Sequence, residues 1–295
     1  MNVLPSDRGF LGLPAEEAYP AAADARAVIV PFGLEATVSY GGGTAAGPAA
    51  ILEASHQVEL FDEEFWCEPV ADYGVATLAP LTPATPVAAA LDQLEHAVRG
   101  IMDAGKFPLT LGGEHSLTAG AIRPFVARYP DLAILHFDAH ADLRDGYEGE
   151  PFSHAAALRR CLDQGDMELV SLGIRNISAE EIPFLDANRE RIHIHWAKDM
   201  RSWDPAEIVK PLAGRPVYLT FDLDGFDASL MAATGTPEPG GMFWDDALAV
   251  IRAAAGVCEI VGADVVELAP KPNLHACDFL AAKLAYKILS YALYE

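Results

Sequence analysis

The sequence predicts an α/β protein built on a mainly parallel sheet with helices on both faces. Short, β-branched or apolar runs alternate with segments of helical spacing, as strand–helix–strand units require. The runs are almost continuously apolar, which is typical of strands buried on both faces. The expected strands lie at 27–33, 107–113, 132–140, 169–175, 191–197, 216–224 and 260–269, and the expected helices at 87–105, 114–130, 245–257 and 279–295.

The chain is expected to form one domain over residues 1–295, with residues 1–25 as an N-terminal extension and a core at about 26–295. No internal repeat, low-complexity tract or linker stands out. The Pro-rich segment 76–86 is short and apolar, so we interpret it as a surface connection.

The charge and the cysteine content limit the classes of binding partner and indicate the cellular compartment. The 43 acidic and 20 basic residues give a net charge of −23, which argues against nucleic acid and anionic membranes as partners. The negative electrostatic potential of such a chain attracts a small cation, although a need for solubility would also explain the negative charge. Four widely spaced cysteines favour reduced thiols. With no signal peptide or membrane span visible, we expect a cytoplasmic protein.

Polar side chains with metal-ligand character follow one of the apolar strands directly. In DAHAD, side chains at alternate positions point the same way, so Asp138, His140 and Asp142 share one side of the chain. Two carboxylates and an imidazole this close suit a divalent metal. The alternative is a solvated, polar strand end.

Two further strand ends carry residues of the same kind. Asp222 and Asp224 share a face in FDLDGFD, where an Asp-rich turn is the alternative, and His115 follows the glycines of GGEHS. Ligands of parallel sheets bind beyond the carboxyl ends of the strands. Four Asp and two His are too many, and too rich in oxygen, for a single zinc ion. They fit two harder divalent ions, with Mn²⁺ as the first choice.

These motifs resemble those of the arginase/agmatinase ureohydrolase family, and most closely the agmatinases. The resemblance rests on GGEHS (112–116), DAHAD (138–142) and FDLDGFDASLMAATGTPEPGG (221–241). It implies a three-layer α/β/α fold, a centre of two Mn²⁺ ions and a homo-oligomer, usually a trimer or hexamer. By resemblance, one ion binds His115, Asp138, Asp142 and Asp222, and the other binds Asp138, His140, Asp222 and Asp224.

The resemblance also assigns two residues to the chemistry. His154 matches the family's catalytic histidine, and an imidazole suits protonation of a leaving amine near neutral pH. Glu267 matches the carboxylate that orients the guanidinium, because its two oxygens can accept hydrogen bonds from paired N–H groups of the guanidinium. An ordinary surface histidine and a structural ion pair are the respective alternatives. His136 points to the same side of the strand as Asp138 and could contact that ligand, but it is interpreted as a packed core histidine.

The predicted reaction is hydrolysis of agmatine to putrescine and urea, a step of polyamine biosynthesis. The loop 143–153 offers Asp145 and Glu148 to a terminal ammonium, and GTPEPGG resembles the agmatinase form. Arg144 could instead hold the carboxylate of a guanidino acid such as guanidinobutyrate. Aminopropylagmatine and arginine are further candidate substrates. A non-catalytic metal-binding regulator and a single-zinc, deacetylase-like amidohydrolase are the alternatives from other classes.

Overall fold

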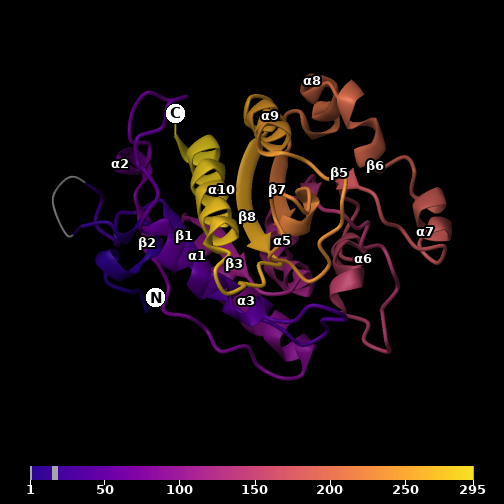
Figure 1. Cartoon of the computed structure of the whole chain (residues 1–295), viewed down its shortest axis with the longest axis horizontal. Coiled ribbons are helices and arrows are strands. Elements are labelled where there is room, and N and C mark those ends of the chain that lie inside the picture. The colour runs from indigo at the N-terminus through magenta and orange to yellow at the C-terminus, as the bar shows by residue number, and fades with distance from the viewer. Residues whose placement is uncertain (1, 15–18, 295) are drawn as a thin grey trace.

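Eight parallel strands form one sheet in the computed structural model, which describes residues 2–14 and 19–294 (Figure 1). The strand order is β2-β1-β3-β8-β7-β4-β5-β6. The strands are β1 (Ala27–Phe32), β2 (Val75–Thr77), β3 (Phe107–Gly112), β4 (Ala133–Phe137), β5 (Glu168–Ile174), β6 (Ile192–Trp196), β7 (Pro216–Asp222) and β8 (Glu259–Val266).

Helices cover both faces of this sheet, so the architecture has three layers, α/β/α. Strand β1 illustrates the arrangement, because Ile29 packs into the apolar cluster of one face and Val28 into that of the other. One face carries α3 (Val87–Asp103), α4 (Thr118–Ala121), α5 (Arg123–Arg128), α6 (Ala157–Leu162) and α7 (Ile182–Ala187). The other carries α1 (Gly47–Ser55), α2 (Val70–Tyr73), α8 (Pro205–Ile208), α9 (Trp244–Ala255) and α10 (His275–Leu293).

The predicted fold class is confirmed, and the differences lie in individual elements. The helix expected at 114–130 is divided at Ile122, because Pro124 has no N–H to continue the helical hydrogen bonds. Helix α10 begins at His275, earlier than expected, and residue 295 of the expected helix lies outside the described residues. The short helix α1 was not predicted.

The interpretation of 76–86 as a surface connection is wrong at its start. Val75–Thr77 form the short edge strand β2, and all three residues are buried. A three-residue strand is too short to show a period in the sequence. Residues 79–86 are half-buried or exposed, as a surface connection should be.

The first residues of the predicted N-terminal extension pack on the core. The backbone N–H of Phe10 donates to Oγ1 of Thr77, and that of Leu11 donates to Oγ of Ser55, both at 2.8 Å. Residues 1 and 15–18 of the extension lie outside the described residues. Within the described ranges, no helix combines the length and the apolar character needed to cross a bilayer.

Candidate metal centre and active site

The predicted ligands meet at the carboxyl edge of four neighbouring strands. In the sheet these strands stand in the order β3-β8-β7-β4. His115 follows β3, Asp138 follows β4, Asp222 ends β7 and Glu267 follows β8. Parallel strands present their carboxyl ends at one edge, so residues more than 100 positions apart in the sequence become neighbours.

His115 lies at the centre of the first group of side chains. Its Nδ1 is 3.1 Å from Oδ2 of Asp138, 3.1 Å from Oδ2 of Asp142 and 3.4 Å from Oδ2 of Asp222. This nitrogen is buried and yet makes no hydrogen bond of acceptable geometry to any described residue. One nitrogen and three carboxylate oxygens that converge without hydrogen bonding form the donor set of a cation site.

His140 belongs to a second group, beside the first. Its Nδ1 is 3.1 Å from Oδ2 of Asp224 and 3.5 Å from Oδ1 of Asp138, and these three side chains have the spacing of a metal site. Asp138 therefore offers Oδ2 to the first group and Oδ1 to the second. This is the arrangement expected of a carboxylate that bridges two ions.

No lysine or arginine in the described ranges forms an ion pair with any of the four aspartates. Burial, followed by the charge of Asp138, raises the pKa of Asp142 to about 7. Burial opposes protonation of His140, but the carboxylates of Asp224 and Asp138 outweigh it and raise the pKa of His140 to about 12. Without an added cation, the cluster retains protons to balance its charge.

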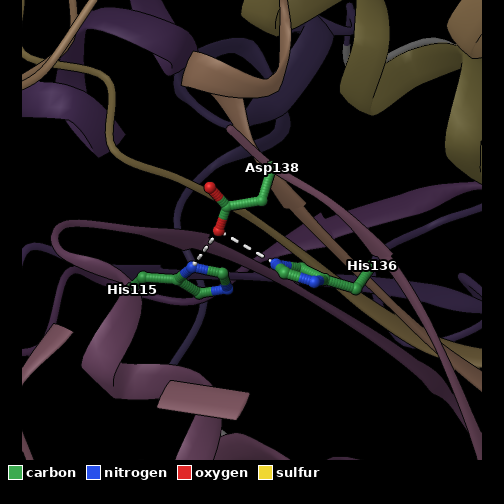
Figure 2. Close-up of side chains that lie close together, drawn as sticks. All are labelled: His115, His136 and Asp138. Carbon is green, nitrogen blue, oxygen red and sulfur yellow. Dashed lines mark hydrogen bonds and ion pairs between the residues drawn. The ribbon is translucent and has the colours of Figure 1, made fainter. Parts of the chain in front are cut away.

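A buried histidine hydrogen-bonds to the predicted ligand Asp138 and holds its carboxylate in place. His136 is fully buried, and its Nε2 lies 2.9 Å from Oδ2 of Asp138 while its Nδ1 lies 2.9 Å from Oγ of Ser171. Figure 2 shows His136 and His115 on either side of the Asp138 carboxylate. His136 is thus a buried histidine, as interpreted from the sequence, and it also makes the contact with Asp138 that was the alternative.

A second chain of contacts holds the His115 ring. Nε2 of His115 lies 2.9 Å from Oγ1 of Thr220, whose hydroxyl donates to Oδ1 of Asp264 at 2.6 Å. The buried Asp264 carboxylate also accepts from the hydroxyls of Tyr218 and Thr118, at 2.8 and 2.9 Å. Since Thr220 donates its only proton to Asp264, His115 must donate to Thr220. Nδ1 of the neutral ring is then free to bind a cation.

A cavity of about 310 Å³ opens over this cluster. His154 and Glu267 line it together with the predicted ligands His115, His140, Asp142, Asp222 and Asp224. The Tyr147 ring packs edge-on against His154, with their centroids 6.2 Å apart. Glu267 accepts a hydrogen bond from the backbone N–H of His115 at 2.7 Å. Burial, with Glu114 nearby, raises the pKa of Glu267 to about 8, so a cation beside it would favour its ionised form.

The structure does not place Asp145 and Glu148 at the cavity. The Asp145 carboxylate pairs with Arg160 and Arg159, and Glu148 is exposed on a turn where its φ is 50°. Neither residue lines the cavity, so the predicted contact with a substrate ammonium is not supported. Arg144, which was considered as a carboxylate partner, does line it and pairs with Glu180 at 3.1 Å.

Glu238 was not selected from the sequence, although it lies within GTPEPGG. It lines the cavity, and its backbone is held by Arg175. The Arg175 guanidinium donates to the carbonyl oxygens of Asp224, Phe226 and Glu238 at 2.7, 3.1 and 2.8 Å. One arginine thereby ties the predicted ligand segment after β7 to the segment that carries Glu238.

The comparisons with known proteins agree with this geometry. A family model described as the arginase family matches residues 25–290. The chain is 37% identical over 284 residues to N(1)-aminopropylagmatine ureohydrolase of Synechocystis sp., covering 93% of this chain and 92% of the relative. It is 36% identical over 278 residues to agmatinase of Bacillus cereus, covering 90% of each. The crystal structure of agmatine ureohydrolase of Thermoplasma volcanium matches with a TM-score of 0.84 at 30% identity, covering 93% of this chain and 92% of that one.

Proposed function

The chain belongs to the arginase family and is a ureohydrolase, and we propose that it hydrolyses agmatine to putrescine and urea. The observation that carries the proposal is one cavity lined by His154, Glu267 and five of the six predicted ligands, with the sixth, Asp138, in contact with His115 and His140. The names of the relatives, agmatinase and N(1)-aminopropylagmatine ureohydrolase, support a cationic guanidino substrate.

The cofactor of this proposal is a pair of divalent cations, with Mn²⁺ as the first choice. The buried, unbonded Nδ1 of His115 among three carboxylate oxygens fits the first ion. His140 and Asp224, with the second oxygen of Asp138, fit the other. Carboxylate-rich sites favour hard ions such as Mn²⁺ over a lone zinc. When bound, the ions lower the pKa of water and so supply a nucleophile at neutral pH.

The protein's own groups then bind the substrate and move the proton. The Glu267 carboxylate accepts N–H donors of the guanidinium and orients its carbon toward the cluster. His154, half-buried at the cavity wall, gives a proton to the departing amine through its ring. Burial lowers the pKa of His154 below its usual value, so its ring is mainly neutral at pH 7. It first takes up a proton released as water adds to the guanidinium carbon and then passes that proton to the amine.

The far end of the substrate determines which guanidino compound is preferred. Of the carboxylates lining the cavity outside the predicted ligands and Glu267, Glu181 already accepts from the backbone N–H groups of Leu143 and Ser178, at 2.9 and 2.6 Å. Glu238 has no hydrogen bond to its carboxylate within the described ranges. We therefore assign the terminal ammonium of agmatine to Glu238.

A guanidino acid is the second candidate substrate, and one observation favours it. Arg144 lines the cavity and stacks over Tyr147, with the guanidinium carbon 5.0 Å from the ring centroid. Its ion pair with Glu180 is to a residue whose side chain is 80% exposed. Because an exposed pair is weak, a substrate carboxylate could displace Glu180.

A substrate panel tests the proposal directly. Urea release is measured with Mn²⁺ and agmatine, N1-aminopropylagmatine, 4-guanidinobutyrate or arginine, together with metal content per chain. Agmatine should show the highest kcat/KM, with two ions bound. A preference for guanidinobutyrate would indicate that Arg144 binds the carboxylate of a guanidino acid and so determines the specificity. One zinc per chain would favour the deacetylase-like alternative, and no urea from any guanidine would favour the non-catalytic one.

Location and assembly are part of the same proposal. All four cysteines, each among the described residues, are free thiols, which supports a reducing, cytoplasmic environment. Assembly into a trimer or hexamer stays a prediction from the family resemblance, and sedimentation of the metal-loaded protein would test it.

A further inference from the structure

Glu114 is a fully buried carboxylate next to the predicted ligand His115, yet the hydrogen bonds it accepts come from other residues. Its Oε2 accepts from the backbone N–H groups of Ala36 and Thr37, both at 2.7 Å. Its Oε1 accepts from the hydroxyls of Thr37 and Ser116, at 2.9 and 2.6 Å. All four partners are donors, so the group acts purely as an acceptor and fastens the segment around Thr37 to the end of β3.

The backbone makes the same connection independently. The N–H of Glu114 donates to the carbonyl of Leu34 at 2.7 Å. A Cβ at Gly113 would lie 2.0 Å from that same carbonyl oxygen, so only glycine allows the approach. The segment 34–37 is therefore held in a defined position against the strand end that carries His115.

From this position Thr37 contacts His154, which is 117 residues away in the sequence. Its Oγ1 lies 3.1 Å from Nδ1 of the ring and accepts from the backbone N–H of His154 at 3.0 Å. A hydroxyl has only one proton to donate. Since the Glu114 carboxylate takes that proton, Nδ1 of His154 must donate to Thr37.

We propose that Thr37, held by Glu114, is a positioning residue that keeps a proton on Nδ1 of His154 and leaves Nε2 as the nitrogen that exchanges protons in the cavity. The inference rests on the proposed function, because it assumes that His154 moves the proton of the reaction. The arrangement joins a carboxylate, a hydroxyl and an imidazole, and each group fixes the proton position of the next.

The central experiment removes the Thr37 hydroxyl at nearly constant shape. Thr37→Val should lower kcat for agmatine roughly tenfold or more, which is a part of what proton transfer by a side chain contributes, while KM changes little. Thr37→Ser retains the hydroxyl and should keep kcat within about threefold of the wild type. Metal content and circular dichroism are measured for each variant, and Thr37→Ala provides a second hydroxyl deletion should Thr37→Val not fold.

Ser153 provides the matched control. Its Oγ lies 3.4 Å from the same Nδ1, at the limit of a hydrogen bond. Ser153→Ala removes a hydroxyl beside the same nitrogen and should leave kcat within about threefold, because Thr37 holds the proton. An equal loss in Ser153→Ala and Thr37→Val would overturn the assignment to Thr37.

A double-mutant cycle separates action through His154 from a general structural effect. If Thr37 acts through the ring, Thr37→Val should cause no further loss in a His154→Ala background. A full additional loss there, a raised KM alone, or wild-type kcat in Thr37→Val would overturn the inference. Wild-type kcat in His154→Ala would overturn the proposed role of His154 as well. Loss in His154→Ala with none in Thr37→Val would overturn only the role of Thr37.

Discussion

Two buried clusters of carboxylates in this molecule solve the same electrostatic problem in different ways. Asp62 and Lys287 are almost fully buried, and Nζ of Lys287 lies 2.8 Å from Oδ2 of Asp62 and 3.4 Å from Oε1 of Glu64. At the carboxyl edge of the sheet, Asp138, Asp222 and their neighbours are also buried, but within the described residues histidines are their only ion-pair partners.

The difference separates a structural site from a candidate functional one. Burying a carboxylate without a positive partner is strongly unfavourable. Where the chain supplies the cation, as Lys287 does for Asp62, the pair joins α10 to the segment before α2. Where it supplies no lysine or arginine, the charge is balanced by protons that the cluster retains or by a bound cation, which is the property expected of a metal centre.

The strongest test of this contrast is Asp138→Ala. Removing the carboxylate that faces both ligand groups should lose metal and activity together, with kcat/KM falling roughly a thousandfold or more, or about 4 kcal/mol of transition-state stabilisation. Metal content and urea release are measured on the same sample. Retention of two ions by this variant would contradict a bridging role, and Asp222→Ala gives the same test on β7.

Lys287→Met should produce the opposite pattern. Asp62 would be left buried without its partner, so unfolding free energy should fall by about 3 to 5 kcal/mol. Denaturant unfolding measures this change. The folded fraction should still release urea and should bind as many metal ions per chain as the wild type. Loss of metal at unchanged stability would show that the two clusters are not independent.

His154→Ala distinguishes holding the metal from moving the proton. The residue lines the cavity, and within the described ranges its ring hydrogen-bonds to Thr37 and Ser153 and to none of the predicted ligands. We expect both ions to remain bound while kcat falls roughly a hundredfold, as is typical when a general acid is removed. Metal analysis beside steady-state kinetics provides the measurement, and a parallel loss of metal would argue for a structural role.

The stability of the metal-free protein should depend on pH. The pKa values of Asp142 and Glu267, about 7 and about 8, are raised mainly by burial, so the folded state holds more protons than the unfolded state between about pH 4 and 8. Stability is therefore lost as pH rises through 7 to 8. The raised pKa of His140 adds a loss above about pH 6.5, and the lowered pKa of Asp138 acts only below about pH 4.

Thermal unfolding of chelated protein between pH 5 and 8 measures this dependence. The midpoint should fall with rising pH, and saturating Mn²⁺ should restore most of the loss because the ions replace the protons. A midpoint that rises over this range without metal would contradict the contrast between the two clusters.

Glu238→Gln is expected to have the smallest effect. If Glu238 binds the terminal ammonium, KM for agmatine should rise about tenfold, equal to about 1.4 kcal/mol. KM for a guanidine that lacks the amine should not change. Asp145→Asn is the matched control at a carboxylate already paired with Arg160. An equal effect of Asp145→Asn would restore the original prediction for the loop 143–153.

The sequence alone was sufficient for the fold class and for the positions of the predicted ligands. Seven apolar runs mark buried strands, and DAHAD and DLD place acids at alternate positions, because the period of a strand is local information. Motif resemblance added His154 and Glu267. The three-residue β2 was not predicted because it has too few residues to show a period. The segment after GGEHS does show helical spacing, but Pro124 divides the helix at Ile122.

The tertiary structure decided which charged residues are available to a ligand. Asp145 and Glu238 look alike in the sequence, yet Arg160 occupies one while the other lines the cavity. The contact of Thr37 with His154, and the pairing of Asp62 with Lys287 across 225 positions, likewise come from chain segments that meet only on folding. Periodicity determines which way a side chain points along its own strand, but the partner that neutralises a charge depends on long-range packing.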